Sequence, residues 1–160
     1  MKTYETAREL LDCLVDFHHR ACRLLEGAMD MEQSERVLMV LDYLYQHHSE
    51  LQDALATYEE DCEDSGDAGA GILNTWVPYA LNANDSPEAF IDGLDVDEEM
   101  SFEASEALGR ALGDYVVSLV DNICTEIVAP GVAEVFANIL EMERTEQRKL
   151  TRAINSLRDM

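Results

Sequence analysis

The helical periodicity of residues 132–157 constrains the fold of this chain more than any other feature. Apolar side chains recur there at spacings of three and four residues, which is the stripe of an amphipathic helix that faces a core. The stripe consists of Val132, Val135, Phe136, Ile139, Leu150, Ala153, Ile154 and Leu157. This pattern predicts a long helix that packs against other helices.

Two acidic residues interrupt the stripe from within. At 100° per residue, Glu143 and Glu146 fall on the same face as Ile139 and Leu150. Burying an ionised carboxylate costs several kcal/mol unless a partner group compensates it. The two glutamates therefore predict hydrogen-bonding or charged partners on the neighbouring helices.

Length and charge limit the classes of protein to which the chain can belong. We expect residues 1–160 to form one domain with a substantial core. No apolar run is long enough to cross a membrane, and the first residues do not resemble a signal peptide, so we expect a cytoplasmic protein without a membrane partner. The net charge of −23 makes nucleic acid an unsuitable partner, because its phosphates would be repelled. The excess of acids fits either a salt-tolerant source or an ordinary acidic bacterial protein.

The four cysteines predict buried free thiols rather than disulfides or a thiolate metal site. None of them belongs to a CxxC pair, and three lie within helical patterns. They are Cys13, Cys22, Cys62 and Cys124.

Residues 3–28 and 34–60 predict an antiparallel pair of helices. Each segment carries an apolar stripe, and only a few residues separate the two segments. His18 lies within the first stripe and His48 within the second, while His47 lies on the flank of the second. Counted outward from the turn, His18 and His48 stand at similar heights, which makes them candidates to meet inside the fold.

Residues 61–100 differ in character from the segments on either side. Residues 61–71 are acidic, contain glycine and lack periodicity, which predicts a mobile loop. The next segment holds Trp76, the chain's single tryptophan, among small apolar residues, and we expect it to pack on the helices. Pro87 predicts the first turn of a short helix that ends at Gly93. No strand is predicted, and a connection of this length can cross a bundle from end to end.

Two further helices are predicted over residues 101–129 and 131–158, with a short turn between them. This second pair repeats the pattern of the first pair. Sliding the chain by 95 residues sets His48 beside Glu143 and Leu51 beside Glu146. Two similar helical hairpins joined by a long connection form the layout of a ferritin-like bundle.

The last helix carries the clearest motif of that kind. Its apolar residues Phe136 and Ile139 are followed by Glu143 and, three residues later, by Glu146. The sequence here resembles the ferritin-like, rubrerythrin-like superfamily, in which the final position is usually histidine. The resemblance covers all four helices and implies an all-α, ferritin-like four-helix bundle with a long crossover between the second and third helices.

The other helices depart from the family motif. His48 stands where the family usually has glutamate, and Leu51 stands where it usually has histidine. His18 takes about the place of the family's first glutamate, and the third helix offers Leu112 in place of an acid. A complete di-iron site needs four carboxylates and two histidines, so this sequence does not provide enough ligands for a second metal ion.

The candidate site combines two imidazoles with two carboxylates. His47 is a further candidate ligand outside this set. The predicted metal ligands are His18, His48, Glu143 and Glu146. Such a set could bind one Fe, Mn or Zn ion. Alternatively, the same four groups compensate one another as a buried network without metal. The cofactor is therefore left open between Fe or Mn and none.

Two functions follow from these alternatives. In the first, the chain is a degenerate ferritin-like protein with a structural or protein-interaction role and no assigned catalysis. In the second, it is a metal-binding oxidoreductase or iron-handling protein that uses O2 or peroxide. We expect pairing through helix faces to give a homodimer. A phosphorelay histidine would have to be exposed, which we expect only of His19, and the two adjacent histidine pairs do not give the spacing of a hemerythrin-like site. No candidate geometry for nucleophilic catalysis follows from the sequence.

Overall fold

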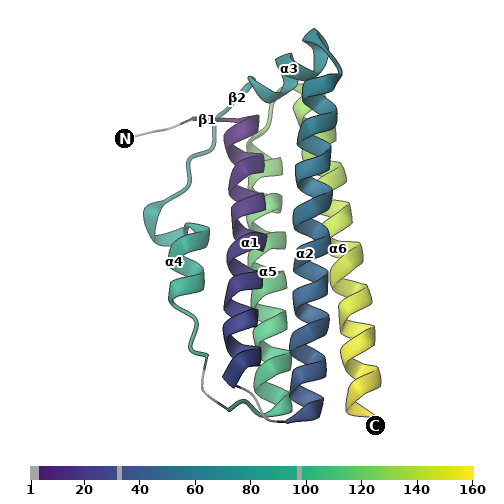
Figure 1. Ribbon diagram of the computed structural model, residues 1–160. Coiled ribbons are helices and arrows are strands. Elements are labelled where there is room, and N and C mark those ends of the chain that lie inside the picture. Colours follow the sequence, from purple (N-terminus) through teal and green to yellow (C-terminus); the bar gives the residue numbers. More distant parts are fainter. Residues whose placement is uncertain (1–3, 32–33, 97–98) are drawn as a thin grey trace.

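Four long helices packed side by side make up most of the molecule (Figure 1). The computed structural model describes residues 4–31, 34–96 and 99–160. The long helices are α1 (Ala7–Met31), α2 (Glu35–Asp64), α5 (Phe102–Glu126) and α6 (Pro130–Arg158). The shorter elements are β1 (Glu5–Thr6), α3 (Asp67–Leu73), β2 (Trp76–Val77), the 3-10 helix η1 (Ala83–Asp85) and α4 (Pro87–Asp92). The all-α class is confirmed.

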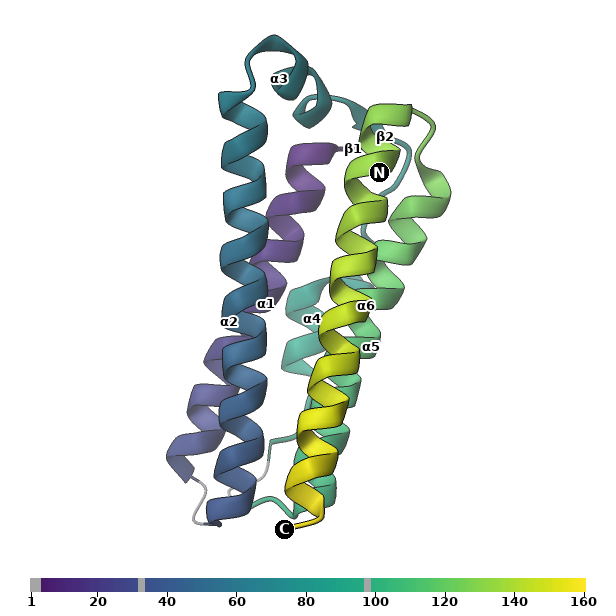
Figure 2. The ribbon, with the colours of Figure 1, turned by 90° about the vertical axis from the view of Figure 1, so that its right-hand side faces the viewer.

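The two figures show the course of the chain through the helices (Figures 1 and 2). Helix α1 descends in the view of Figure 1, α2 and α5 both ascend, and α6 descends to the C-terminus. Residues 74–96 pass along the outside of α1, from the end of the molecule near α3 toward the start of α5. Helices α1 and α6 lie at opposite corners, so a contact between them has to pass through the interior.

Apolar stripes and serine caps explain why these helices form where they do. The stripes are buried against one another in a single core, whose largest fully buried side chains include Phe17 and Phe136. Ser34 accepts a hydrogen bond from the backbone N–H of Val37, and Ser101 caps α5 in the same way. Helix α1 begins at Ala7 and ends at Met31, and the predicted start at residue 3 lies outside the described residues.

The acidic segment after residue 60 is helical, which corrects the predicted mobile loop. Helix α2 continues to Asp64, and α3 follows after a reversal at Gly66, whose φ is +76°. Gly69 packs so closely that an added Cβ would lie 1.8 Å from the carbonyl oxygen of Cys62. Two glycines at this corner let a second short helix fold back, an arrangement that residue periodicity alone does not reveal.

A two-residue ribbon near the N-terminus also differs from the prediction. Strands β1 and β2 pair antiparallel, with Thr6 opposite Trp76, although the sequence pattern predicts no strand. Leu73 and Val77 are buried, as expected for a segment that packs on the helices, but the Trp76 side chain is 63% exposed. In a strand, neighbouring side chains point to opposite faces, so burial of Val77 turns Trp76 outward.

Helix α4 forms where Pro87 predicts it and holds the long connection against the bundle. Phe90 stacks on Tyr115 of α5, with ring centroids 4.2 Å apart. The Tyr115 hydroxyl donates a hydrogen bond of 2.7 Å to the backbone carbonyl of Asp85. Glu88 lies 3.9 Å from Arg20 of α1.

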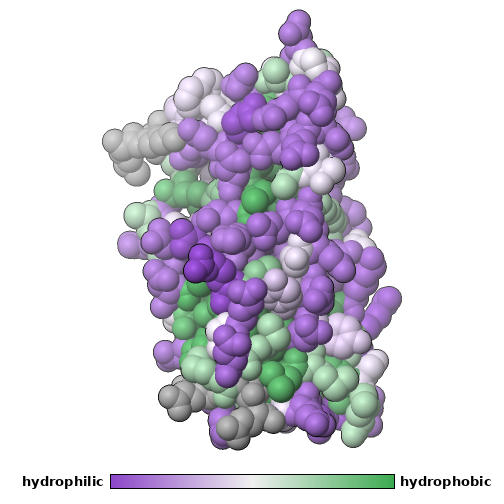
Figure 3. Space-filling view, in the orientation of Figure 1, coloured by the Kyte–Doolittle hydropathy of each residue, from purple (hydrophilic) through white to green (hydrophobic). Residues whose placement is uncertain are grey.

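The cysteines are free, as the sequence predicts, but most of them are less buried than expected. In the view of Figure 3, hydrophilic residues cover most of the face, and apolar residues are scattered among them. All four cysteines are free, but only Cys22 is buried, while the other three are partly exposed. Among the helices built from the described residues, none combines the length and apolar character that a bilayer crossing needs.

Candidate functional site

Three of the four predicted site residues meet at the centre of the bundle. His18 of α1, His48 of α2 and Glu143 of α6 are 0%, 0% and 1% exposed. The His18 Nδ1 atom lies 2.9 Å from His48 Nδ1, and the His18 Nε2 atom lies 2.7 Å from Glu143 Oε1. These contacts form a chain from His48 through His18 to Glu143, which we call the histidine chain. It joins the opposite corners of the bundle.

The chemistry of the groups fixes most of the hydrogen bonding in this chain. A carboxylate can only accept, so His18 donates from Nε2 to Glu143. Burial, together with the charges of His18 and His47, lowers the pKa of His48 well below 6.5, so His48 is neutral. A neutral His48 either donates from Nδ1 to a neutral His18 or accepts from a doubly protonated His18. In both arrangements His18 uses both ring nitrogens.

One polar atom of the histidine chain is left without a partner. His48 Nε2 is buried and makes no hydrogen bond. A buried polar atom of this kind normally has a partner, because leaving it unpaired costs about 1–3 kcal/mol. The unpaired atom therefore either lowers the stability of the fold or marks a position where a bound group supplies the missing contact.

Phe17 separates the histidine chain from the α4 side of the bundle. Its ring stands edge-on to His18 and His48, at centroid distances of 5.1 and 5.9 Å. The same ring contacts Tyr115, at a centroid distance of 5.1 Å. Phe17 belongs to the apolar stripe of α1, but the stripe alone gives no signal that it borders the site.

Glu146 does not join the histidine chain, which corrects the predicted four-residue site. Its carboxylate is partly exposed and pairs with the Lys149 amine at 2.9 Å. Three residues turn a helix by about 300°, so Glu146 sits to one side of Glu143. The lysine one turn further along holds it at the surface. Leu51 and Leu112 are both buried in the apolar interior.

His47 connects the interior with a surface groove between α2 and α6. Its ring meets that of His48 edge-on at 4.9 Å, and its side chain is nearly buried. Burial lowers the pKa of His47 to about 4, although the carboxylates of Glu143 and Glu146 act in the opposite direction. The groove has a volume of about 460 Å³ and is lined by Asp42, Tyr43, Gln46, His47, Glu50, Glu146, Lys149, Leu150 and Ala153.

The arrangement of the nitrogens favours hydrogen bonding over metal ligation. His18 points its two ring nitrogens at two different partners, so those two contacts cannot share one metal ion. Within residues 4–31, 34–96 and 99–160, no group of three or more His, Cys, Asp or Glu side chains is placed to hold a metal ion. His48 Nε2 has a free position, yet the ligands needed to complete a coordination shell around it do not converge there.

Acid is expected to destabilise the fold through His47. The unfolded histidine titrates near 6.5 and the folded one near 4, so the unfolded state binds more protons between these values. Stability is therefore lost as the pH falls from 6.5 toward 4, by about 2–3 kcal/mol for His47 at pH 4.5. Urea unfolding at pH 7 and pH 4.5 measures this loss, which should be smaller in His47→Gln.

Glu59 also titrates in this pH range, so the loss of stability of the unchanged chain has to be compared with that of His47→Gln. Burial and a hydrogen bond with Asp12 raise the pKa of Glu59 to about 7, so its contribution to stability falls as the pH rises from 4.5 to 7. That change opposes the effect of His47 in the intact protein but is common to both proteins in the comparison. An equal loss of stability in His47→Gln and in the unchanged chain would show that His47 titrates normally.

Comparison of the chain with models of protein families, with curated proteins and with solved structures finds no match.

Proposed function

We propose that this chain is a ferritin-like four-helix bundle whose metal centre has been replaced by a metal-free histidine chain, and that it has a structural or protein-interaction role without catalysis. The observation that carries the proposal is the pairing of His18 with His48 and Glu143, both at hydrogen-bond distance. Three of the four predicted ligands, His18, His48 and Glu143, compensate one another directly. Buried polar groups satisfied in this way need no ion to offset their burial.

The direction of the helices supports the ferritin-like part of the proposal. Helices α2 and α5 both ascend in the view of Figure 1, and residues 74–96, which connect them in the sequence, pass back along the outside of α1. Consecutive parallel helices with one long crossover are typical of ferritin-like bundles. On this proposal, the connection between α2 and α5 forms that crossover, and α3 and α4 belong to it.

A metal-binding function is the second candidate, and a specific observation favours it. His48 Nε2 is a buried nitrogen without a partner, which is where a metal ion or a water could bind. In this alternative the protein is an Fe or Mn oxidoreductase or an iron-handling protein, and His18, His48, Glu143 and Glu146 supply the ligands after rearrangement.

Metal analysis of the full chain separates the two candidates. Protein purified without chelator should contain less than about 0.1 equivalent of Fe, Mn or Zn, and calorimetry with anaerobic Fe(II) or Mn(II) should show no stoichiometric binding. His48→Ala is compared with His19→Ala, since His19 is the exposed neighbour of His18 on α1. One equivalent of metal that is lost in His48→Ala and kept in His19→Ala would overturn the metal-free proposal.

The proposed interaction role includes pairing with a second copy of the chain in the cytoplasm. Light scattering on the purified chain tests this part directly. A mass of about 36 kDa, twice that of the 18.0 kDa chain, is expected, and 18.0 kDa at all concentrations would contradict the homodimer.

A further inference from the structure

A second polar site lies in a groove between α5 and α6, near the end of α6 and away from the histidine chain. The groove has a volume of about 280 Å³, which is small for a drug-sized ligand but sufficient for a compound with a few carbon atoms. One wall carries Glu106, Arg110 and Arg158. The rest is lined by Gly109, Gln147, Leu150, Thr151, Ile154 and Asn155.

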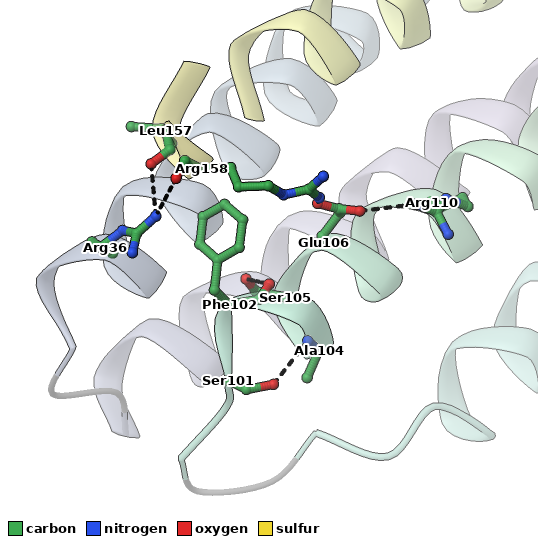
Figure 4. Close-up of polar contacts among 9 residues, drawn as sticks. All are labelled: Arg36, Ser101, Phe102, Ala104, Ser105, Glu106, Arg110, Leu157 and Arg158. Carbon is green, nitrogen blue, oxygen red and sulfur yellow. Dashed lines mark hydrogen bonds and ion pairs between the residues drawn. The ribbon is translucent and has the colours of Figure 1, made fainter. Parts of the chain in front are cut away.

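Two arginines hold one carboxylate in this wall (Figure 4). Arg110 pairs with Glu106 Oε1 at 2.9 Å, and Arg158 pairs with the other oxygen, Oε2. Two positive charges therefore face one negative charge, so the lining of the groove is positive in a chain of net charge −23. The arrangement already accommodates a carboxylate group, that of Glu106.

The guanidinium of Arg158 is held in place by the surrounding helices. It lies over the Phe102 ring, 5.8 Å from the ring centroid, and Arg36 lies over the same ring at 4.9 Å (Figure 4). Arg36 also donates hydrogen bonds of 2.9 and 3.0 Å to the carbonyls of Leu157 and Arg158, which fixes the end of α6. A side chain fixed before binding loses less entropy when a ligand arrives.

Both arginines keep donors for a further anion. Each guanidinium has five N–H groups, and the contact with Glu106 uses only part of them. Arg110 is exposed, so its remaining donors are accessible from the groove. The floor between the walls is apolar, because Gly109, Leu150 and Ile154 are buried there.

We propose that this groove binds a short organic carboxylate, with the charged end at Arg110 and Arg158 and the aliphatic part on Leu150 and Ile154. Guanidinium groups match carboxylate geometry, and an apolar floor favours a carbon chain over an inorganic ion. The site shares no residue with the histidine chain, so it is independent of the function proposed above.

Titration of the full chain with sodium butyrate tests the site. Chemical-shift changes in NMR spectra at constant ionic strength should saturate and should be confined to residues that line the groove. Butyramide, which has the same carbon chain without the charge, should cause no saturable shift. Inorganic phosphate should bind more weakly than butyrate. Shifts spread over the surface, or equal binding of butyramide or phosphate, would overturn the proposal.

Arginine variants locate the binding. Arg110→Gln should raise the Kd for butyrate by about tenfold or more, since one charge-assisted contact is lost. Arg148→Gln removes the same charge from an exposed residue of α6 that does not line the groove, and it should leave the Kd within about twofold. Arg110→Lys keeps the positive charge but loses the planar guanidinium group that can make two parallel hydrogen bonds to a carboxylate. It should therefore weaken binding as well. Equal losses in the Arg110 and Arg148 variants would overturn the assignment.

Discussion

Replacing Glu143 with leucine is expected to lower the free energy of unfolding by about 3 kcal/mol. Glu143 is 1% exposed and accepts the hydrogen bond of His18 Nε2 at 2.7 Å. Its loss leaves the Nε2 donor of His18, which is 0% exposed, without a partner. Urea unfolding at pH 7 measures the loss, and the melting temperature should fall by roughly 10 °C.

Two further variants make this result specific. Glu143→Gln keeps an oxygen that can accept from His18, so its loss of stability should be smaller than that of Glu143→Leu. Glu146→Leu lies three residues further along the same helix and breaks only a partly exposed pair with Lys149, which should cost less than about 1 kcal/mol. If Glu143→Leu and Glu146→Leu cost the same, the assignment of Glu143 to the interior is wrong.

The second large effect is expected at Phe17. Phe17→Ala should lower the free energy of unfolding by about 3–5 kcal/mol, because the side chain is fully buried and the cavity left behind cannot close completely. The cavity would lie between the two imidazoles and the Tyr115 ring, which all contact Phe17. Urea unfolding again gives the size of the loss.

A surface aromatic serves as the control for Phe17. Tyr43→Ala on α2 removes a side chain that is 47% exposed, and its cost should stay below about 1 kcal/mol. The Phe17→Ala variant should also bring the His18 and His48 ring protons into faster exchange with water. A Phe17→Ala variant as stable as the unchanged chain would mean that α1 packs in a different register.

Much of the fold could be predicted from the sequence because the helices are long and strongly amphipathic. The stripe of residues 132–157 predicts the buried face of α6, and it marks Glu143 as an acid that needs partners. His18 and His48 match in height along their helices, and they are in contact. A helical period fixes both the face and the height of a side chain, so contacts of this kind follow from counting residues.

The remaining features depend on contacts that a helical period does not encode. The stripe predicts Glu146 beside Glu143, but a surface lysine one turn later pairs with it. The reversal at Gly66 depends on a positive φ that other residues rarely adopt, and it produces a helix where the sequence predicts a loop. The positions of Arg110 and Arg158 around Glu106 depend on how α5 and α6 meet, and the sequence places these two arginines far apart.

The most direct test of this account measures the hydrogen bond between the two imidazoles. In a chain labelled with ¹⁵N-histidine, the account predicts a scalar coupling between His18 Nδ1 and His48 Nδ1, transmitted through their shared proton across 2.9 Å. The coupling should disappear in His48→Ala and persist in His19→Ala. Two uncoupled rings, with a His48 ring that titrates at its ordinary pKa near 6.5, would contradict the buried histidine chain.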